Sequence, residues 1–493
     1  MNGDTVQSVM PPVLTELDRI SSAIAPQDGR ALLVSRSLPW PATALVDFLG
    51  LGAGAPRVYW ESGETSTGFA GFGVALALTA AGPNRFRDVQ ASVRRLSDSA
   101  IWEAVNAPPA AGPHLFGGFA FQPEHAPAGI WAAFPAACFI LPRYQLTRVE
   151  GRNWLTVNQI VEELQTANGD LRTPNGRPRN GRPANTISPS GLRRPQPATH
   201  NLQLSIVNCQ LSIVNSMPAA RWRHVVNDAV RRIRHGDLDK VVLARTCDVR
   251  MDRDVDPTKV LARLERRYPG CYRFLIEPAP GHAFFGATPE LLVEVNGMTL
   301  NTVAMAGSVP RGDSAAADAA FAREIMTSLK ERQEHAFVVD AIETSLRPLV
   351  TELDVPEQPA LRRLRNIQHL QTVIRGRLAD GAGVLEAVEA LHPTPAVGGV
   401  PRLPALQMIA DEEPVPRGWY ASPVGWMDLQ GNGVFGVAIR SAVSVGAQAR
   451  LYAGAGIVAD SDAEREWEET ELKFRPMLEA LGEISGQWSV VGG

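Results

Sequence analysis

The sequence lacks several features that would assign it to a specialised class of protein. Its 493 residues contain only four cysteines, none in C-x-x-C spacing, so no disulfide framework is indicated. The N-terminus has no basic stretch followed by an apolar run, as a signal peptide would. The longest apolar stretch, residues 69–82, is about 14 residues long, whereas a membrane span needs about 20. We therefore expect a cytoplasmic protein that does not enter a membrane.

An excess of basic charge is also missing. The net charge is −4, from 48 basic and 52 acidic side chains, and aromatic residues make up only 6% of the chain. Neither an attractive field for nucleic acid nor an obvious stacking surface for bases is indicated. With 45% hydrophobic and 20% charged residues, the composition is that of a globular protein, either one large body or two to three domains.

The first part of the chain, residues 1–169, has the pattern of a β-rich unit. Short apolar segments alternate with glycine-rich turns. The predicted strands are residues 31–38, 58–62, 68–78, 115–121, 138–149 and 153–160. The last two are expected to form a hairpin around Glu150 and Gly151.

Residues 170–216 interrupt this pattern. Residues 170–199 contain six prolines, six arginines and one acidic residue, and too few large apolar side chains to offset the entropy lost on ordering. A short repeat follows, LQLSIVN (202–208) and CQLSIVN (209–215). We expect a low-complexity, disordered insertion at a surface loop.

Residues 217–493 return to a regular pattern of helices and strands. An apolar stripe predicts a helix over residues 219–234 that stops at Gly236, and residues 240–250 read as a strand. Further helices are expected within residues 315–345 and from about 461 to 481, and residues 361–378 suggest a mixture of helix and strand.

Two helix motifs carry closely spaced acids. Glu331 and Glu334 share one helix face, and Glu466 and Glu469 repeat the spacing, with Lys473 one turn further on. Two converging helices of this kind would suit Mg²⁺, which takes a few protein carboxylates, waters and oxygens of an anionic substrate. Taken alone, a solvated charged face explains the same pattern.

Two single residues stand out at strand ends. Lys240 opens the apolar run KVVLAR and is either a snorkelling lysine or a base, which would have to be uncharged near neutral pH. Glu290 directly follows Thr288 and Pro289, and proline there excludes a regular central strand. Glu290 is therefore either an exposed strand-end residue or a carboxyl group aimed into a cavity.

Three glycine-rich segments could hold an anion through backbone N–H groups, or form plain tight turns. They are AMAGSVPRG (304–312), HPTPAVGGVPR (392–402) and YAGAGIV (452–458). None is a P-loop or a dinucleotide-binding fingerprint.

In this order, these segments resemble the chorismate-utilising enzymes: anthranilate synthase large subunit, aminodeoxychorismate synthase, isochorismate synthase and salicylate synthase. The resemblance covers residues 221–481 and, more loosely, the N-terminal YWES and AGFG segments. It implies an α+β fold, a large single body of two packed antiparallel-rich β-sheets with outer helices. It also implies chorismate as the substrate and a monomer without an amidotransferase subunit.

Two positions favour isochorismate synthase, an isomerase, within this family. Aminodeoxychorismate synthases place a nucleophilic lysine where this chain has Ala306, so a covalent lysine intermediate is not expected. Anthranilate synthases lack the lysine that corresponds to Lys240, whereas isochorismate and salicylate synthases have it. The implied nucleophile is water.

The resemblance also implies roles for individual residues. Lys240 would be the general base and Glu290 the general acid. Mg²⁺ would be bound by Glu334 and Glu469, with Glu331 and Glu466 orienting its waters. The substrate-binding residues carried over from the family are Gly307, Ser308, His369, Ala396, Tyr420, Arg440, Gly454, Gly456 and Lys473. His392 and Val397 are weaker members of the same set.

Three alternatives stay open. Salicylate synthase shares the same residues and adds loss of pyruvate. An amine-transferring synthase subunit would need ammonia or glutamine, and a non-catalytic anion-binding protein would show no turnover. The residues do not indicate whether isochorismate would feed menaquinone, siderophore or salicylate formation.

Overall fold

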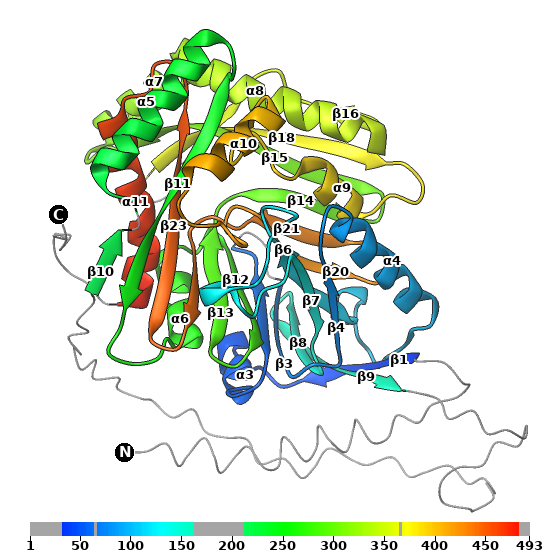
Figure 1. Ribbon diagram of the computed structural model, residues 1–493. Helices are drawn as coiled ribbons and strands as arrows, with labels where there is room; N and C mark the ends of the chain where they lie inside the picture. Colours follow the sequence, from blue (N-terminus) through cyan, green and yellow to red (C-terminus); the bar gives the residue numbers. More distant parts are fainter. Residues whose placement is uncertain (1–31, 64–66, 162–211, 216, 364–366, 483–493) are drawn as a thin grey trace, which may run out of the picture.

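Two large β-sheets form the body of the protein (Figure 1). The structure is a computed structural model that describes residues 32–63, 67–161, 212–215, 217–363 and 367–482.

In spatial order, the first sheet contains β10 (Ser212–Asn215), β11 (Lys240–Arg250), β23 (Gln448–Ile457), β22 (Ser441–Val445), β13 (His282–Thr288), β12 (Tyr272–Ala279), β2 (Arg57–Glu61), β3 (Gly68–Phe72), β8 (Tyr144–Val149), β9 (Arg152–Val161), β1 (Leu32–Trp40) and β5 (Ile101–Ala104), with β19 (Gly399–Val400) beside β11. The second contains β16 (Val350–Asp354), β18 (Ile367–Leu378), β15 (Thr299–Pro310), β14 (Leu291–Asn296), β21 (Gly433–Val437), β20 (Pro423–Asp428), β6 (His114–Phe119), β7 (Ala137–Leu141) and β4 (Leu76–Ala80), with β17 (Ala360–Arg363) beside β18. Among these described strands only β1 and β5 pair in parallel.

Helices lie on the outer sides of the sheets, as Figure 1 shows for α4, α5, α8 and α10. The helices are α3 (Leu45–Leu51), α4 (Arg85–Asp98), α5 (Ala219–His235), α6 (Pro257–Arg267), α7 (Ala315–Thr327), α8 (Leu329–Leu346), α9 (Val384–Leu391), α10 (Arg402–Glu412) and α11 (Ala463–Leu481), with short 3₁₀ turns at Pro109–Ala111, Gly129–Trp131 and Arg347–Leu349. Helix α8 packs on β15, and α11 packs on β23 and α5. These contacts set where two acidic helices meet the sheets.

Strand β2 shows how the first sheet is covered on both faces. All five of its residues are buried. Val58 and Trp60 belong to the core that the two sheets share, whereas Tyr59 belongs to a second core under α3, α6 and α11. Successive side chains of a strand point to opposite faces, so both faces of β2 are covered. The sheets themselves meet through aromatic contacts such as that of Phe69 with Phe116, whose ring centroids are 5.5 Å apart.

Strands from distant parts of the chain share each sheet. In the first sheet β2 pairs with β12, and in the second β6 pairs with β20. The described parts of residues 1–169 and 217–493 therefore contribute to the same two sheets. The predicted α+β body of two packed, antiparallel-rich sheets with outer helices is confirmed.

Locally encoded elements match the sequence prediction. Glu150 and Gly151 both have positive φ, 49° and 77°, and join β8 to β9 as a two-residue hairpin turn. Helix α5 buries Trp222, Val225, Val226, Ala229 and Val230, and ends at Gly236 with φ of 85°.

Two of the strand predictions are wrong, because each predicted strand corresponds to two separate strands in the structure. The segment 138–149 divides at Pro142 into β7 and β8, which belong to different sheets. Proline has no N–H for the ladder, so the chain leaves one sheet there and enters the other. The segment 68–78 likewise divides at Gly73, whose φ is 69°, into β3 and β4.

The predicted insertion needs one correction. Residues 170–211 and 216 lie outside the described residues, and they include the first copy of the short repeat, residues 202–208. Residues 212–215, however, form β10, which pairs antiparallel with β11. Ile and Val are residue types enriched in strands, and β11 supplies the partner for pairing. The predicted helix content of residues 361–378 is also wrong, since the described residues there are β17 and β18.

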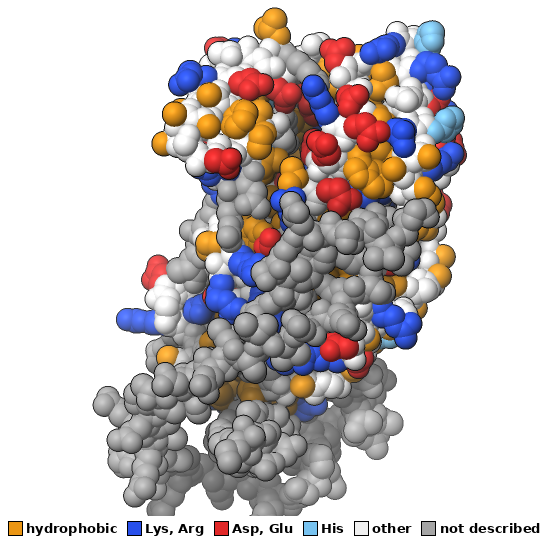
Figure 2. All heavy atoms as spheres, turned by 90° about the vertical axis from the view of Figure 1, so that its left-hand side faces the viewer, with side chains coloured by type: hydrophobic (Ala, Val, Ile, Leu, Met, Phe, Trp, Pro, Cys, Tyr) orange, Lys and Arg blue, Asp and Glu red, His pale blue; other side chains and the backbone are white. Residues whose placement is uncertain are grey.

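The surface around α5, α7 and α11 mixes side chains of every kind. In Figure 2, Lys and Arg side chains of the described residues lie among acidic and hydrophobic ones instead of forming one basic area. No helix in the described ranges combines the length and apolar character needed to cross a bilayer.

Candidate active site

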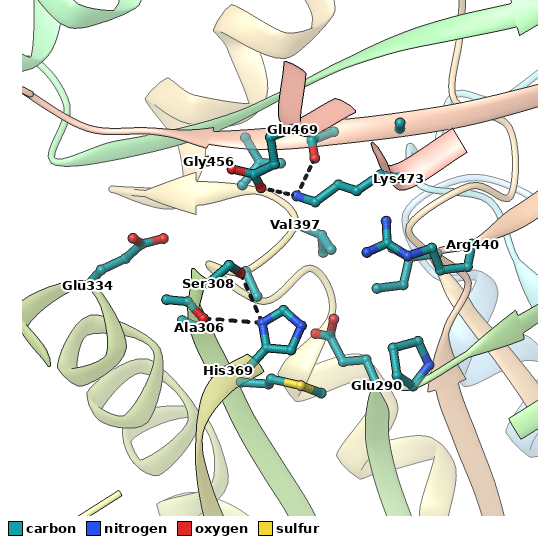
Figure 3. Close-up of a pocket in the computed structure, with 18 of the residues that line it drawn as sticks. Glu290, Ala306, Ser308, Glu334, His369, Val397, Arg440, Gly456, Glu469 and Lys473 are labelled. Atoms are coloured by element: carbon teal, nitrogen blue, oxygen red, sulfur yellow. Dashed lines mark hydrogen bonds and ion pairs between the residues drawn. The ribbon is translucent and has the colours of Figure 1, made fainter. Parts of the chain in front are cut away.

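One cavity collects most of the residues singled out in the sequence (Figure 3). It has a volume of about 120 Å³. The predicted residues that line it are Lys240, Glu290, Gly307, Ser308, Glu334, His369, Ala396, Val397, Tyr420, Arg440, Gly454, Gly456, Glu469 and Lys473, and Ala306 lies among them. The sequence placed these residues together only through their order in motifs. The structure brings them into one site, while their chemical roles stay predictions.

Three predicted residues lie apart from the cavity wall. Glu331 accepts a hydrogen bond from the backbone N–H of Ser308 at 3.3 Å, so it lies behind the predicted substrate-binding turn. Glu466 is part-exposed on α11. His392 is buried against the carbonyl oxygen of Phe121, 3.3 Å from its Nε2, and burial lowers its pKa to about 3.

Several residues that line the cavity were not predicted from the sequence. They are Val242, Pro289, Met305, Ile439, Tyr452 and Ala453. A signal was present for all of them, because each lies within two residues of a predicted site residue. Tyr452 stacks on Tyr420 with ring centroids 4.9 Å apart.

Lys240 enters the cavity from the first residue of β11. Its side chain is 3% exposed, and its Nζ lies 2.6 Å from Oε1 of Glu334 on α8. Gly456 makes room for this pair, since a Cβ there would lie 3.1 Å from Cε of Lys240 and 3.3 Å from Oε1 of Glu334. The amine therefore has a fixed position at the meeting point of β11, β23 and α8.

Glu290 lies where the chain passes from one sheet to the other. Thr288 ends β13 in the first sheet, and Leu291 begins β14 in the second. The carbonyl of Glu290 accepts a hydrogen bond from the N–H of Val437 at 3.0 Å, and its own N–H donates to Oγ1 of Thr288 at 3.2 Å. The backbone is thus fixed on both sides, as expected of a residue that aims its side chain into a cavity.

The carboxyl group of Glu290 is an unpaired acid in this site. It makes no hydrogen bond with any residue that the structure describes. Burial raises its pKa to about 7, against the opposing charges of Lys240, Lys473 and Arg440. Near neutral pH a substantial fraction of Glu290 therefore carries a proton.

A second lysine–glutamate pair lies on α11. Lys473 pairs with Glu469 and donates a hydrogen bond to the carbonyl oxygen of Gly454 at 2.8 Å. Burial acts to raise the pKa of Glu469, but Lys473 and Arg440 hold this pKa below its usual value. Figure 3 shows Glu469 and Lys473 on one side of the cavity and Glu334 on another.

Glu334 and Glu469 are the two predicted metal ligands that line the cavity. However, the described residues contain no group of three or more His, Cys, Asp and Glu side chains arranged to hold a metal ion. Two carboxylates, one from α8 and one from α11, match the number that Mg²⁺ often takes from a protein, with waters and substrate oxygens as its other ligands. They would not fit a metal that needs a complete cage of protein ligands.

Arg440 gives the cavity a free cation. Within the described part of the chain, its guanidinium makes no hydrogen bond or ion pair, and burial lowers its pKa. Its backbone has a φ of 50°, a strained conformation for a residue with a side chain and one that is concentrated at functional sites. An unpaired arginine in a cavity is suited to a carboxylate.

His369 forms the remaining polar wall. Its Nδ1 lies 2.9 Å from Oγ of Ser308 and 3.1 Å from the carbonyl oxygen of Gly307. Burial lowers the pKa of His369 to about 4, so the ring is neutral at physiological pH. The site as a whole combines a free acid, two lysines, a free arginine and a neutral histidine, an arrangement for a small polyanion and proton transfer.

Comparison with known proteins agrees with this description. Residues 18–482 match the family model described as chorismate binding enzyme. The chain is 38% identical to the salicylate biosynthesis isochorismate synthase of Pseudomonas aeruginosa over 87% of its own length and 86% of that protein. It is 33% identical to the isochorismate synthase MenF of Bacillus subtilis, covering 93% of this chain and 95% of the relative.

Solved structures show the same fold. The menaquinone-specific isochorismate synthase MenF of Escherichia coli superposes with a TM-score of 0.73 and 26% identity, covering 95% of this chain and 99% of that one. A second match is a structure described as a putative 2,3-dihydroxybenzoate-specific isochorismate synthase, DhbC, of Bacillus anthracis. It has a TM-score of 0.68 and 27% identity, and the match covers 89% of this chain and 99% of that one.

Proposed function

The chain belongs to the chorismate binding enzyme family, and on this premise we propose that it is an isochorismate synthase that converts chorismate to isochorismate. The observation that carries the proposal is the placement of Lys240 and the unpaired Glu290 in one cavity. A base and an acid that line the same cavity are what an exchange of hydroxyl groups on a ring requires.

The proposed reaction needs two proton transfers. Lys240, uncharged, takes a proton from a water molecule that attacks C2 of the ring. Glu290 gives its proton to the hydroxyl group that leaves C4, and the double bond shifts. One water enters and one leaves, so the reaction is an isomerisation. For this step the amine of Lys240 must give up its ion pair with Glu334.

The remaining polar residues would hold the two carboxylates of chorismate. Arg440, with Tyr420 beside it, would bind the enolpyruvyl carboxylate through its free guanidinium. His369 and Ser308 would face the ring near the C4 hydroxyl. We further propose that Glu334 and Glu469 hold Mg²⁺, which when bound would clamp the ring carboxylate and act as a Lewis acid.

Ala306 and Lys240 together support water as the nucleophile. Ala306 lines the cavity with a methyl group, so no enzyme lysine is available at that position, and Lys240 is a residue that anthranilate synthases, which use ammonia, lack. The proposed partner is therefore the small-molecule substrate alone, with no amidotransferase subunit.

Product identification tests the proposed function. The purified full-length chain is incubated with chorismate and MgCl₂, with and without EDTA, and the products are separated by chromatography. Isochorismate is expected without added ammonia. Release of pyruvate together with fluorescent salicylate would assign salicylate synthase instead. Ammonia-dependent anthranilate or aminodeoxychorismate would assign an amine-transferring enzyme, and absence of any turnover would favour a binding protein.

The pH dependence should show the ionisation of Glu290. The mechanism needs Glu290 protonated and Lys240 uncharged, and the pKa of Glu290 is about 7. Above about pH 7 the loss of the Glu290 proton therefore opposes the gain in uncharged Lys240, and kcat/KM should rise less steeply with pH than it would beside an acid that stays neutral. The measurement is kcat/KM from pH 6 to 9 at constant ionic strength. The residual activity of Glu290→Gln, whose side chain does not ionise, should rise more steeply with pH than that of the wild type. Equal slopes for the wild type and Glu290→Gln would contradict a protonated Glu290.

The proposed metal ligands can be tested on α11. Glu469→Gln removes a charged oxygen ligand, so it should raise the Mg²⁺ concentration for half-maximal activity by about tenfold or more. A tenfold rise corresponds to a loss of about 1.4 kcal/mol in the free energy of Mg²⁺ binding. Titration calorimetry with Mg²⁺ and no substrate gives a second measurement. Glu468→Gln is the matched control, because Glu468 is exposed on the same helix. An unchanged Mg²⁺ response in Glu469→Gln would remove this residue from the metal site.

A further inference from the structure

A buried ion pair lies directly behind the cavity. Glu413 follows the end of α10, and Arg417 lies four residues further along the chain. Their side chains are 6% and 3% exposed, and Nη2 of Arg417 lies 2.6 Å from Oε1 of Glu413. Nε of Arg417 also donates to Oε2 at 2.9 Å. The contact is therefore bidentate, which fixes the plane of the guanidinium as well as its position.

The other donors of Arg417 reach two separate segments of backbone. Nη1 donates to the carbonyl oxygen of Val397 at 2.7 Å, and Nη2 donates to the carbonyl oxygen of Val242 at 2.8 Å. Glu413 in turn accepts a hydrogen bond from the N–H of Ala244 at 2.8 Å. One ion pair thus connects β11 with the turn that contains Val397.

Both of these segments are walls of the active site. Val242 and Val397 line the cavity, and neither belongs to α10 or to the segment that carries Arg417. Val242 lies two residues after Lys240 on β11, so its side chain and that of Lys240 share one face of the strand. The N–H of Val242 also donates to the carbonyl oxygen of Gly398 at 2.8 Å. The position of β11 relative to the turn therefore sets where the Lys240 amine lies.

Arg417 has a third link to the site through Tyr420. Its guanidinium carbon lies 5.9 Å from the ring centroid of Tyr420 and 4.3 Å from that of Phe121. The N–H of Tyr420 donates to the carbonyl oxygen of Arg417 at 3.0 Å. Arg417 itself does not line the cavity. It can act on the reaction only through the residues that it holds.

Stability alone is a weak explanation for such a pair. Two charges lose their hydration when buried, and apolar residues of similar volume often serve the fold equally well. Apolar residues cannot hold two walls of a cavity at a fixed distance through hydrogen bonds. A guanidinium that donates to both walls can do so. Displacement of a catalytic group by about 1 Å can lower the rate about 10²-fold.

We propose that Arg417, oriented by Glu413, is a positioning residue that fixes Val242 and Val397 relative to each other and so aligns Lys240 with the substrate. The inference rests on the proposed function. Arg417 forms no hydrogen bond with Arg440, the residue proposed to bind the enolpyruvyl carboxylate, whereas it bonds to the backbone of Val397 and of Val242 on the strand that carries Lys240. Its loss should therefore affect kcat more than KM.

The test uses the full-length chain and three variants of the pair. Arg417→Gln should lower kcat about 10²-fold and change KM less than about threefold. Arg417→Lys, which keeps the charge but not the fork, should fall between Arg417→Gln and the wild type. The double variant Arg417→Met with Glu413→Leu removes both charges together, so that no unpaired charge stays buried, and should show the same loss of kcat in a folded protein.

A matched ion pair elsewhere provides the control. Arg57 and Glu277 are also buried, with Nε and Oε2 2.5 Å apart, but neither lines the cavity. Arg57→Gln should lower Tm yet leave kcat and KM as in the wild type, measured well below its Tm.

The outcomes separate this inference from the proposed function. Wild-type kcat in the folded double variant would overturn the positioning role and leave the function intact. If all variants of the pair were unfolded at 25 °C, the pair would be needed for folding, and the positioning role would again be overturned. A wild-type chain that does not convert chorismate would overturn the proposed function first, before any variant is compared.

Discussion

The Lys240→Ala enzyme is expected to fold, to bind chorismate, and to convert it about 10²- to 10⁴-fold more slowly than the wild type, which is the usual contribution of a general base. Water is a poor nucleophile without one, and the described cavity lining offers only one other amine, that of Lys473. Lys473 is already bonded to Glu469 and to the carbonyl oxygen of Gly454. The measurement is kcat and KM under saturating Mg²⁺, with circular dichroism to confirm the fold.

Two further variants make the Lys240 result specific. Lys240→Arg can still pair with Glu334 but cannot lose its proton near neutral pH, so it should be as slow as Lys240→Ala if Lys240 acts as a base. Lys259→Ala is the control, because Lys259 is an exposed lysine on α6 that pairs with Asp256. Substantial activity in Lys240→Arg would reduce Lys240 to an electrostatic role, and full activity in Lys240→Ala would exclude it from the mechanism.

Glu290→Gln should cause a loss of similar size, about 10²- to 10⁴-fold in kcat. Glutamine has the shape of protonated Glu290 and can donate a hydrogen bond, but it cannot transfer a proton to the departing hydroxyl. The variant should fold at least as well as the wild type above pH 7, because it removes a buried carboxyl group whose ionisation burial disfavours. The measurements are single-turnover rate and Tm at pH 6 and pH 8.

The control for this substitution lies on the neighbouring strand. Glu294 is on β14, close to Glu290 in sequence, but does not line the cavity. Glu294→Gln should retain wild-type kcat. If Glu290→Gln also turned over chorismate at the wild-type rate, then a hydrogen bond would suffice and Glu290 would not be the proton donor.

The sequence predicted best those features that are determined locally. The hairpin at Glu150 and Gly151 and the end of α5 at Gly236 depend on the conformations that these few residues prefer. The α+β class, in contrast, followed from the resemblance to the chorismate-utilising enzymes and not from local preferences. In the site, short motifs identified Lys240, Glu290 and Arg440 because each lies in or beside a recognisable segment.

The features that were not predictable depend on contacts between distant segments. Nothing near Pro142 indicates that β7 and β8 join different sheets, since this depends on strands that lie far away in sequence. The same holds for Arg417, which bonds to carbonyl groups of Val242 and Val397, 175 and 20 residues away. A charged residue within the apolar segment PVPRGWYASPVGW was the one available signal that Arg417 is buried.

The pairing of β2 with β12 has a consequence for how the chain is made. The ribosome delivers Arg57–Glu61 long before Tyr272–Ala279, so during synthesis β2 has no neighbour on one side. At about 5–20 residues per second, this wait lasts on the order of ten seconds or more. For that time the N–H and C=O groups on one edge of β2 lack their native partners, and such an unpaired edge can pair with other newly made chains. Its folding yield in a cell should therefore depend on chaperones that hold nascent chains, even though the finished protein leaves this edge fully covered.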